Sequence, residues 1–177
     1  MRIVAGELGG RRLATPPRRS VGVRPTSDRV REALFSILGD VQGSRVLDLF
    51  CGTGALGIEA LSRGAASATL VDTHTALVWR NVAELGVGHR CEVVRSDARA
   101  FLRRSRREFD LIFCDPPYRL ADRLRGDLDS LIPKRLAPGG RLIVEGAARR
   151  PLTLSLPVVT ERRYGDTAVT VYEQAPR

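Results

Sequence analysis

The tetrapeptide Asp115-Pro116-Pro117-Tyr118 carries the residue types best suited to chemistry, and it follows a short apolar run, 109–114. Two prolines fix their own φ angles and keep the preceding residue extended, so this loop is stiff. The Asp115 carboxylate and the Pro116 carbonyl offer two hydrogen-bond acceptors, and Tyr118 offers a face on which a base can stack. This set suits an exocyclic base amino group, a poor nucleophile that must be held in line with an electrophilic carbon. A rigid turn with an ordinary aromatic residue is the simpler alternative.

A glycine-rich loop follows another apolar run. Asp48 stands inside the end of that run, and the loop consists of Phe50, Cys51, Gly52, Thr53 and Gly54. Glycines let the backbone approach a ligand closely and adopt positive φ, and the loop amides can face that ligand. Dehydrogenases use a related strand–loop–helix turn, but the spacing Asp-x-x-x-Gly-x-Gly differs from their GxGxxG. The loop therefore predicts a bound cofactor, and Asp48 is placed to receive an amino group or a water molecule.

Two more acidic residues end apolar runs. Asp72 follows the run 68–71, where a carboxylate can accept hydrogen bonds from both hydroxyls of a ribose. Asp97 and Ala98 follow the run 92–94 in the same way. Either aspartate can also simply cap the helix that it precedes.

The elements that carry these residues alternate along the chain from Arg45 onward. Apolar runs cover 46–50, 68–71, 92–94, 109–114 and 141–144, and helical stretches between them cover about 55–63, 74–85, 97–104 and 121–136. Such alternation predicts an α/β fold with a doubly wound, mostly parallel sheet. Two extended runs, 152–162 and 167–173, flank a Gly165 turn and predict a terminal antiparallel hairpin.

The amino-terminal segment predicts a small β-hairpin extension. A short strand starts at Arg2, Gly9 and Gly10 form a turn, and a second strand covers 11–13. A Pro- and Arg-rich connector follows over 15–25, and an amphipathic helix over 27–38. We divide the chain into a basic arm, 1–25, and a catalytic domain, 26–177.

Composition and charge narrow the function. The 177 residues are 43% hydrophobic and 28% charged, as in an ordinary globular domain. Basic residues outnumber acidic ones by 29 to 20, and Lys134 is the only lysine. Arginine donates two hydrogen bonds to a phosphate, so a polyanionic partner is expected. Eight arginines in residues 1–31 give that segment +6 of the total charge of +9.

Cysteine and histidine usage argues against a metal site. Cys51, Cys91 and Cys114 are widely spaced, without a CxxC pair, and only His74 and His89 accompany them. No run is long enough for a membrane span. We therefore expect no bound metal and a location in the cytoplasm. We also expect a monomer.

Several segments together resemble one family. They are MRIVAG at 1–6, GRRL at 10–13, RPTSDRVREALF at 24–35 and DPPY at 115–118. This pattern resembles the RsmD family of bacterial 16S ribosomal RNA guanine-N2 methyltransferases, named for guanine 966, and the predicted fold resembles the Rossmann-like class I methyltransferase sheet. The resemblance implies transfer from S-adenosylmethionine, giving S-adenosylhomocysteine, to RNA within the small ribosomal subunit. It also implies that Thr26 contacts the donor and that the Asp97 side chain meets the amino group of the donor's adenine.

The arginines sort by their place along the strands, because ligands of open α/β sheets bind at the carboxyl ends. Candidate phosphate contacts are Arg11, Arg12, Arg18, Arg19 and Arg24 in the arm, and Arg119, Arg123, Arg125, Arg162 and Arg163 near the mouth of the site. A second cluster, Arg103, Arg104, Arg106 and Arg107, precedes a strand and is expected away from the site.

Other functions share parts of this pattern. An N6-adenine DNA methyltransferase would carry the same DPPY loop, although 177 residues leave little room for a target-recognition region. A nicotinamide-dependent oxidoreductase would show GxGxxG and a catalytic base. A non-enzymatic RNA-binding module would need no donor pocket, so stabilisation by S-adenosylhomocysteine would exclude it.

Overall fold

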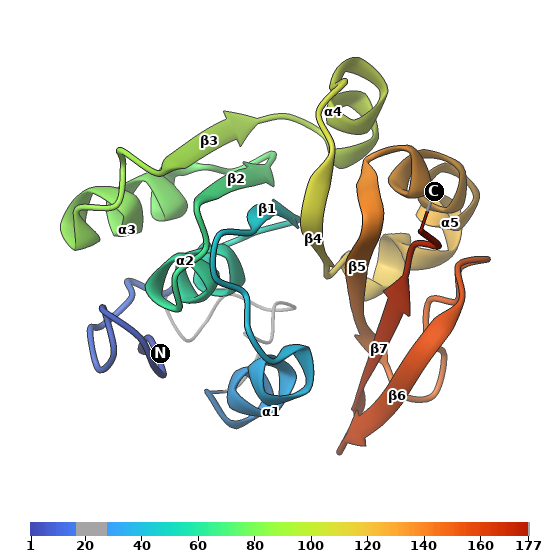
Figure 1. Cartoon of the computed structure of the whole chain (residues 1–177), viewed down its shortest axis with the longest axis horizontal. Helices are drawn as coiled ribbons and strands as arrows, with labels where there is room; N and C mark the ends of the chain where they lie inside the picture. Colours follow the sequence, from blue (N-terminus) through green and yellow to red (C-terminus); the bar gives the residue numbers. More distant parts are fainter. Residues whose placement is uncertain (17–27, 177) are drawn as a thin grey trace.

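The computed structural model describes residues 1–16 and 28–176 (Figure 1). Its elements, in chain order, are α1 (Asp28–Leu38), β1 (Arg45–Leu49), α2 (Ala55–Ser62), β2 (Ser67–Asp72), α3 (Ala76–Leu85), β3 (Cys91–Arg95), α4 (Ala98–Arg104), β4 (Phe109–Cys114), α5 (Tyr118–Leu131), the 3-10 helix η1 (Ile132–Lys134), β5 (Leu136–Ala147), β6 (Val158–Tyr164) and β7 (Thr167–Glu173). No helix within these described ranges is long and apolar enough to cross a membrane.

The strands form one sheet in the order β3-β2-β1-β4-β5-β7-β6. Strands β1 to β5 run parallel, and β7 is antiparallel to both β5 and β6. The chain reverses its direction of travel across the sheet between β1 and β4, and such a switch point opens a crevice at the carboxyl ends of the strands. The predicted doubly wound sheet with an antiparallel hairpin is confirmed.

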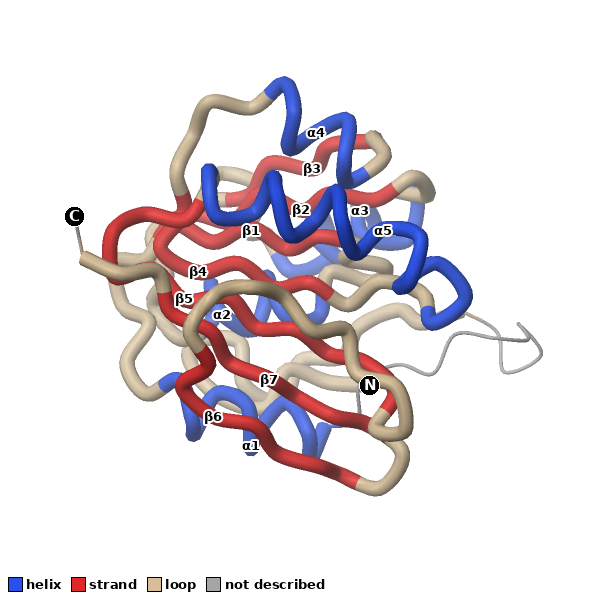
Figure 2. Tube along the Cα trace, turned by 90° about the vertical axis from the view of Figure 1, so that its right-hand side faces the viewer, coloured by secondary structure: helices blue, strands red, loops and turns tan. Residues whose placement is uncertain are grey.

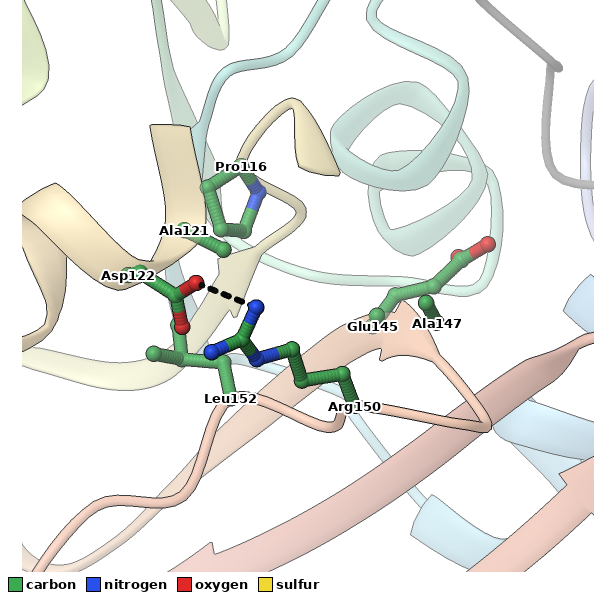
Figure 3. Close-up of a pocket in the computed structure, with 8 residues that line it drawn as sticks. Pro116, Ala121, Asp122, Glu145, Ala147, Arg150 and Leu152 are labelled. Carbon is green, nitrogen blue, oxygen red and sulfur yellow. Dashed lines mark ion pairs between the residues drawn. The ribbon is translucent and has the colours of Figure 1, made fainter. Parts of the chain in front are cut away.

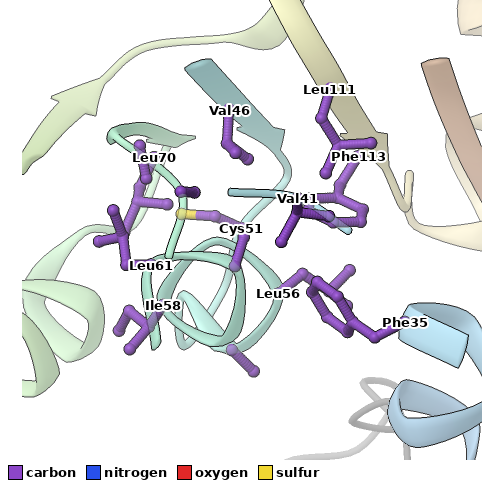
Figure 4. Packing of buried hydrophobic residues seen from close by; sticks show 14 of the residues in the cluster. Phe35, Val41, Val46, Cys51, Leu56, Ile58, Leu61, Leu70, Leu111 and Phe113 are labelled. Carbon is purple, nitrogen blue, oxygen red and sulfur yellow. The ribbon is translucent and has the colours of Figure 1, made fainter. Parts of the chain in front are cut away.

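Helices cover both faces of the sheet. Figure 2 shows α4 and α5 on one face, and α1, α2 and α3 on the other. Each face has its own apolar core, because successive strand residues point to opposite sides. In the first core, Phe35 of α1 packs with Phe113 of β4, their ring centroids 5.8 Å apart (Figure 4). In the second core, Phe101 and Leu128 pack against Ile112.

The described part of the amino-terminal arm, residues 1–16, folds back onto α2 and α3 (Figure 1). Arg2 and Arg12 form a single antiparallel bridge, where two strands were predicted. The pairing is short because the next backbone donors bind a side chain: the amides of Val4 and Ala5 donate to the Glu59 carboxylate of α2, at 2.7 and 3.0 Å. The arm is therefore held against α2, the helix that follows the glycine loop.

Several predicted boundaries were wrong at the carboxyl-terminal side. The strand predicted from 152 begins only at Val158, because Leu152 and Leu154 turn into the second core instead of pairing with β7. The helix predicted over 121–136 spans Tyr118–Leu131 and then tightens into η1, whose first turn contains Pro133. A proline lacks the amide that an α-helix interior needs, so it suits a new first turn.

Candidate active site

The glycine loop leaves β1 at its carboxyl end and opens α2. Phe50, Gly52 and Gly54 all have positive φ, at 61°, 54° and 78°. A β-carbon on Gly54 would lie 2.7 Å from the Val78 side chain, so the loop is closed beneath. A β-carbon on Gly52 would meet nothing within 4 Å, so the loop is open above. The backbone therefore forms a cradle in which a ligand can approach the chain closely.

Asp48 lies beneath this cradle and is only 2% exposed. One carboxylate oxygen accepts a hydrogen bond from the Gly57 amide at 3.0 Å. Burial, with a smaller contribution from the charge of Asp72, raises the pKa of Asp48 to about 7 despite the Gly57 hydrogen bond. A cationic or amino group arriving beside this carboxylate would favour its charged form.

Asp72 ends β2 and reaches across to the glycine loop. Its carboxylate accepts hydrogen bonds from the Gly52 amide and the His74 amide, each at 2.9 Å. These contacts fix the side chain beside the open part of the cradle. Asp72 is therefore held in place by backbone groups before any ribose binds.

Asp97 caps α4, as the simpler of its two interpretations predicted. Its side chain accepts hydrogen bonds from the amides of Arg99 and Ala100, at 3.0 and 3.2 Å. Burial alone raises the pKa of Asp97, but these bonds and the Arg99 guanidinium lower it overall. Capping leaves the residue at the carboxyl end of β3, so the predicted contact with a ligand is still open to it. Ala98 is buried in the second core.

The Asp115-Pro116-Pro117 loop leaves β4 next to the glycine loop. Leu49 of β1 pairs with Cys114 of β4, so both loops depart from neighbouring strands at the same level. Pro117 is the N-cap of α5, and Tyr118 is its first residue. The Tyr118 side chain lies outside the described part of the structure. The register thus brings the two loops that the sequence singled out to one place.

The pKa of Asp115, the acid of this loop, is strongly shifted. Burial, followed by the charges of Glu145 and Asp48, raises the pKa of Asp115 well above its ordinary value. The described residues make no hydrogen bond to its carboxylate. The Asp115 carboxylate can therefore accept hydrogen bonds from a ligand that enters the site.

A cavity of about 200 Å³ opens beside Pro116, between α5 and the end of β5 (Figure 3). An ion pair between Arg150 and Asp122, at 3.3 Å, lies across it. Figure 3 shows the Glu145 carboxylate pointing away from that pair. Glu145 was not among the predicted site residues, although its signal was the same as for Asp72 and Asp115: an acidic residue directly after an apolar run.

The predicted RNA-binding arginines are dispersed. Arg18, Arg19 and Arg24, together with the predicted donor contact Thr26, lie outside the described residues. Arg11 is exposed and donates to the Glu84 carbonyl of α3 at 3.1 Å. Arg12, Arg119, Arg123, Arg125, Arg162 and Arg163 are exposed.

Strand pairing shows which of the arginines predicted near the mouth of the site lie at the same edge of the sheet. Arg162 pairs with Val169, which pairs with Glu145, so the end of β6 is level with the end of β5. Arg119 stands in the first turn of α5. At the opposite edge, Arg103 and Arg107 form ion pairs with Asp127 and Glu92, as expected for a solvated cluster.

The cysteines do not add reactivity to this region. Burial raises the pKa of both Cys51 and Cys114 far above that of a free thiol. Among the described residues no group of three or more His, Cys, Asp or Glu side chains could hold a metal ion.

Known proteins resemble this chain in sequence. The family described as Conserved hypothetical protein 95 matches residues 1–173. Ribosomal RNA small subunit methyltransferase D of Escherichia coli (strain K12) is 45% identical over 123 residues, 67% of this chain. The chain covers 61% of that relative's length in this match. Putative rRNA methyltransferase YlbH of Bacillus subtilis (strain 168) is 36% identical over 98% of this chain and 99% of the relative.

A solved structure extends the likeness to the whole chain. The putative methyltransferase yhhF from Escherichia coli superimposes with a TM-score of 0.83 at 34% identity, covering 100% of this chain and 99% of that one. The predicted class I methyltransferase fold is thereby confirmed.

Proposed function

This chain belongs to the RsmD family of small-subunit ribosomal RNA methyltransferases, and we propose that it methylates the exocyclic N2 amino group of a guanine in 16S ribosomal RNA. The methyl donor of this proposal is S-adenosylmethionine. The observation that carries the proposal is the strand register that places the Asp115-Pro116-Pro117 loop beside the glycine loop. A donor cradle and a stiff loop of hydrogen-bond acceptors then face one crevice.

The donor side of the crevice fits S-adenosylmethionine. The cradle is open at Gly52, where a ligand can approach the backbone. Asp48 lies beneath it for the amino group of the methionine part, and Asp72 stands beside it for the ribose hydroxyls. Asp97 follows β3, where it can meet the adenine. When bound, the donor supplies an electrophilic methyl group on a sulfonium.

On the acceptor side, the chain's own residues hold the nitrogen. Asp115 and the Pro116 carbonyl accept hydrogen bonds from the two N–H groups of the amino group, which keeps the nitrogen lone pair directed at the methyl donor. The prolines limit the motion of these acceptors, because each fixes its own φ. Tyr118 is proposed to stack on the base. The loop thus orients the nitrogen. As the N–C bond forms and the bond from sulfur to the methyl carbon breaks, the Asp115 carboxylate takes the proton that the nitrogen releases.

The RNA is proposed to be part of an assembled or assembling small ribosomal subunit, and the enzyme is proposed to act as a cytoplasmic monomer. The arm and the mouth arginines would contact phosphates on either side of the crevice. The charge of +9 supports a polyanionic substrate.

The decisive experiment compares three substrates under one set of conditions: undermethylated small ribosomal subunits, free ribosomal RNA and duplex DNA. We expect transfer to the subunits, and mass spectrometry should place the methyl group on N2 of a guanine. Transfer to adenine in DNA would replace this proposal with the N6-adenine alternative. Absence of stabilisation by S-adenosylhomocysteine would instead indicate an RNA-binding module.

A further inference from the structure

The cavity beside Pro116 adjoins the loop that the proposed function assigns to the target nitrogen. Pro116, Ala121 and Leu152 give this cavity apolar walls, and Asp122 and Arg150 face each other across it. Apolar walls with a few polar groups are typical of a pocket that takes a small molecule or a single base.

The two charged residues reach the cavity from different elements. Helix α5 begins at Tyr118, and Asp122 stands four residues later, so these two positions lie on the same face of the helix. Arg150 comes from the segment after β5, where its amide donates to the Ala147 carbonyl at 3.0 Å. Figure 3 shows the Arg150 guanidinium reaching back to Asp122, below the Pro116 ring. The fold therefore brings an acid and a base together next to the stiff loop.

The ion pair presents a hydrogen-bond acceptor next to a donor. Nη1 of Arg150 lies 3.3 Å from Oδ2 of Asp122, and a carboxylate only accepts hydrogen bonds whereas a guanidinium only donates them. The side chains of Arg150 and Asp122 are 81% and 62% exposed, so their pairing contributes little to the stability of the fold. The pair is thus accessible to a ligand.

We propose that this ion pair recognises the target base as guanine. In guanine, the N2 amino group, the N1–H donor and the O6 acceptor follow one another along one edge. With N2 held at Asp115 and the Pro116 carbonyl, N1–H donates to Asp122 and O6 accepts from Arg150. The inference rests on the proposed function, because it names the residues that give that same site its specificity for the base.

Adenine offers a different pattern at these positions. With its N6 amino group at the loop, adenine turns the N1 acceptor towards the Asp122 carboxylate and the C2–H group towards Arg150. Two acceptors then face each other, and the guanidinium loses water without gaining a hydrogen bond, which is unfavourable. The ion pair therefore disfavours adenine as well as favouring guanine.

A base analogue tests this recognition without removing the nucleophile. 2-Aminopurine keeps the amino group on C2 but lacks both N1–H and O6. Small ribosomal subunits would be reconstituted with 16S ribosomal RNA that carries guanine or 2-aminopurine at the methylated position, and kcat/KM would be measured with saturating donor. The wild type should prefer guanine by about 10²-fold or more, because a site built around hydrogen bonds rejects an analogue that lacks them.

Two variants should reduce this preference. Arg150→Met removes the N–H donors at similar side-chain length, and Asp122→Ala removes the acceptor. Each should lower kcat/KM for guanine by about tenfold or more, and change kcat/KM for 2-aminopurine by less than about threefold. A merely structural role would slow transfer to both bases equally. Donor affinity, measured by calorimetry, should match the wild type in both variants.

Arg149→Met is the matched control, because Arg149 is exposed and adjacent in the chain but is not among the residues that line the cavity. This variant should keep the wild-type preference for guanine. Equal losses on both bases in Arg150→Met and Asp122→Ala, or a wild type that treats both bases alike, would overturn the inference while methylation of guanine upholds the proposed function. Absence of wild-type transfer to N2 of guanine would instead overturn the proposed function, and this inference with it.

Discussion

The carboxylates at the ends of β1, β2 and β3 differ from the Asp115 carboxylate after β4 in what already binds them. Backbone amides donate to each of the first three: Gly57 to Asp48, Gly52 and His74 to Asp72, Arg99 and Ala100 to Asp97. We call this the donor half. In the acceptor half, Asp115 receives no hydrogen bond from the described residues, and its charged neighbours are the acids Glu145 and Asp48.

This difference indicates two ways to prepare a site. Backbone amides are fixed by the fold, so the donor half is shaped before a ligand arrives. In the acceptor half, neighbouring acids destabilise the negative charge of Asp115. This carboxylate is therefore stabilised strongly when an amino group approaches it. Substitutions should therefore separate the two halves: one set should abolish transfer with donor binding retained, the other should weaken donor binding.

The largest effect is expected from Asp115→Ala. It removes the carboxylate proposed to hold the acceptor nitrogen, so transfer should fall on the order of 10²-fold or more. Calorimetry should show unchanged donor affinity, because Asp115 is not part of the donor half. Transfer at a near wild-type rate would show that the acceptor half does not depend on this carboxylate.

Asp72→Ala should affect the other half. Loss of a charged hydrogen-bond acceptor should weaken S-adenosylmethionine binding by about 1–3 kcal/mol. The Gly52 and His74 amides would also lose their partner, so the loop should become less ordered as well. Calorimetry is the measurement, and unchanged affinity would remove Asp72 from the donor half.

Asp48→Asn should change how stability depends on pH in the donor-free protein. The pKa of Asp48 is about 7 in the folded chain, against about 4 when unfolded. The contribution of Asp48 to the stability of the folded protein is therefore present below about pH 4 and is lost as pH rises towards about 7. The wild type should lose stability relative to Asp48→Asn by about 1.4 kcal/mol per pH unit across that window.

Urea unfolding at several pH values measures this difference. Asparagine can still accept the Gly57 hydrogen bond, so the variant isolates the charge. Parallel stability curves would mean that the Asp48 carboxylate is solvated or neutralised in the folded protein, and that the donor half contains no unpaired buried charge.

Sequence patterns predicted much of the fold and part of this comparison. Acidic residues within or directly after the ends of apolar runs pointed to Asp48, Asp72 and Asp115, because a strand end at a switch point is set by local hydrophobicity and chain order. Glu145 gave the same signal, yet only the β4–β5 register shows that it faces Asp115. The docking of the arm on Glu59 was also missed, because a buried glutamate inside an apolar helix looks like a surface residue until its backbone donors are known.

The smallest effect, and the one that tests how far the halves are independent, concerns the arm. Replacing Arg11, Arg12, Arg18 and Arg19 with Gln should weaken RNA binding and flatten its salt dependence. Each lost phosphate contact removes roughly 0.7–0.9 from the slope of log affinity against log salt. A matched control replaces Arg103, Arg104, Arg106 and Arg107 with Gln. It removes the same formal charge at the opposite edge of the sheet.

Donor affinity is the sharper part of this test, because the arm is physically joined to the donor half. Asn81 of α3 accepts from the Ala14 amide and donates to the Ala14 and Thr53 carbonyls, which links the arm to the glycine loop. Arg11 adds a bond to the Glu84 carbonyl. The Asn81 link involves no arginine side chain, so the variant should keep wild-type donor affinity. An unchanged salt slope would assign RNA contact to Arg119, Arg162 and Arg163 instead, whereas a weaker donor affinity would show that arm and cradle act together.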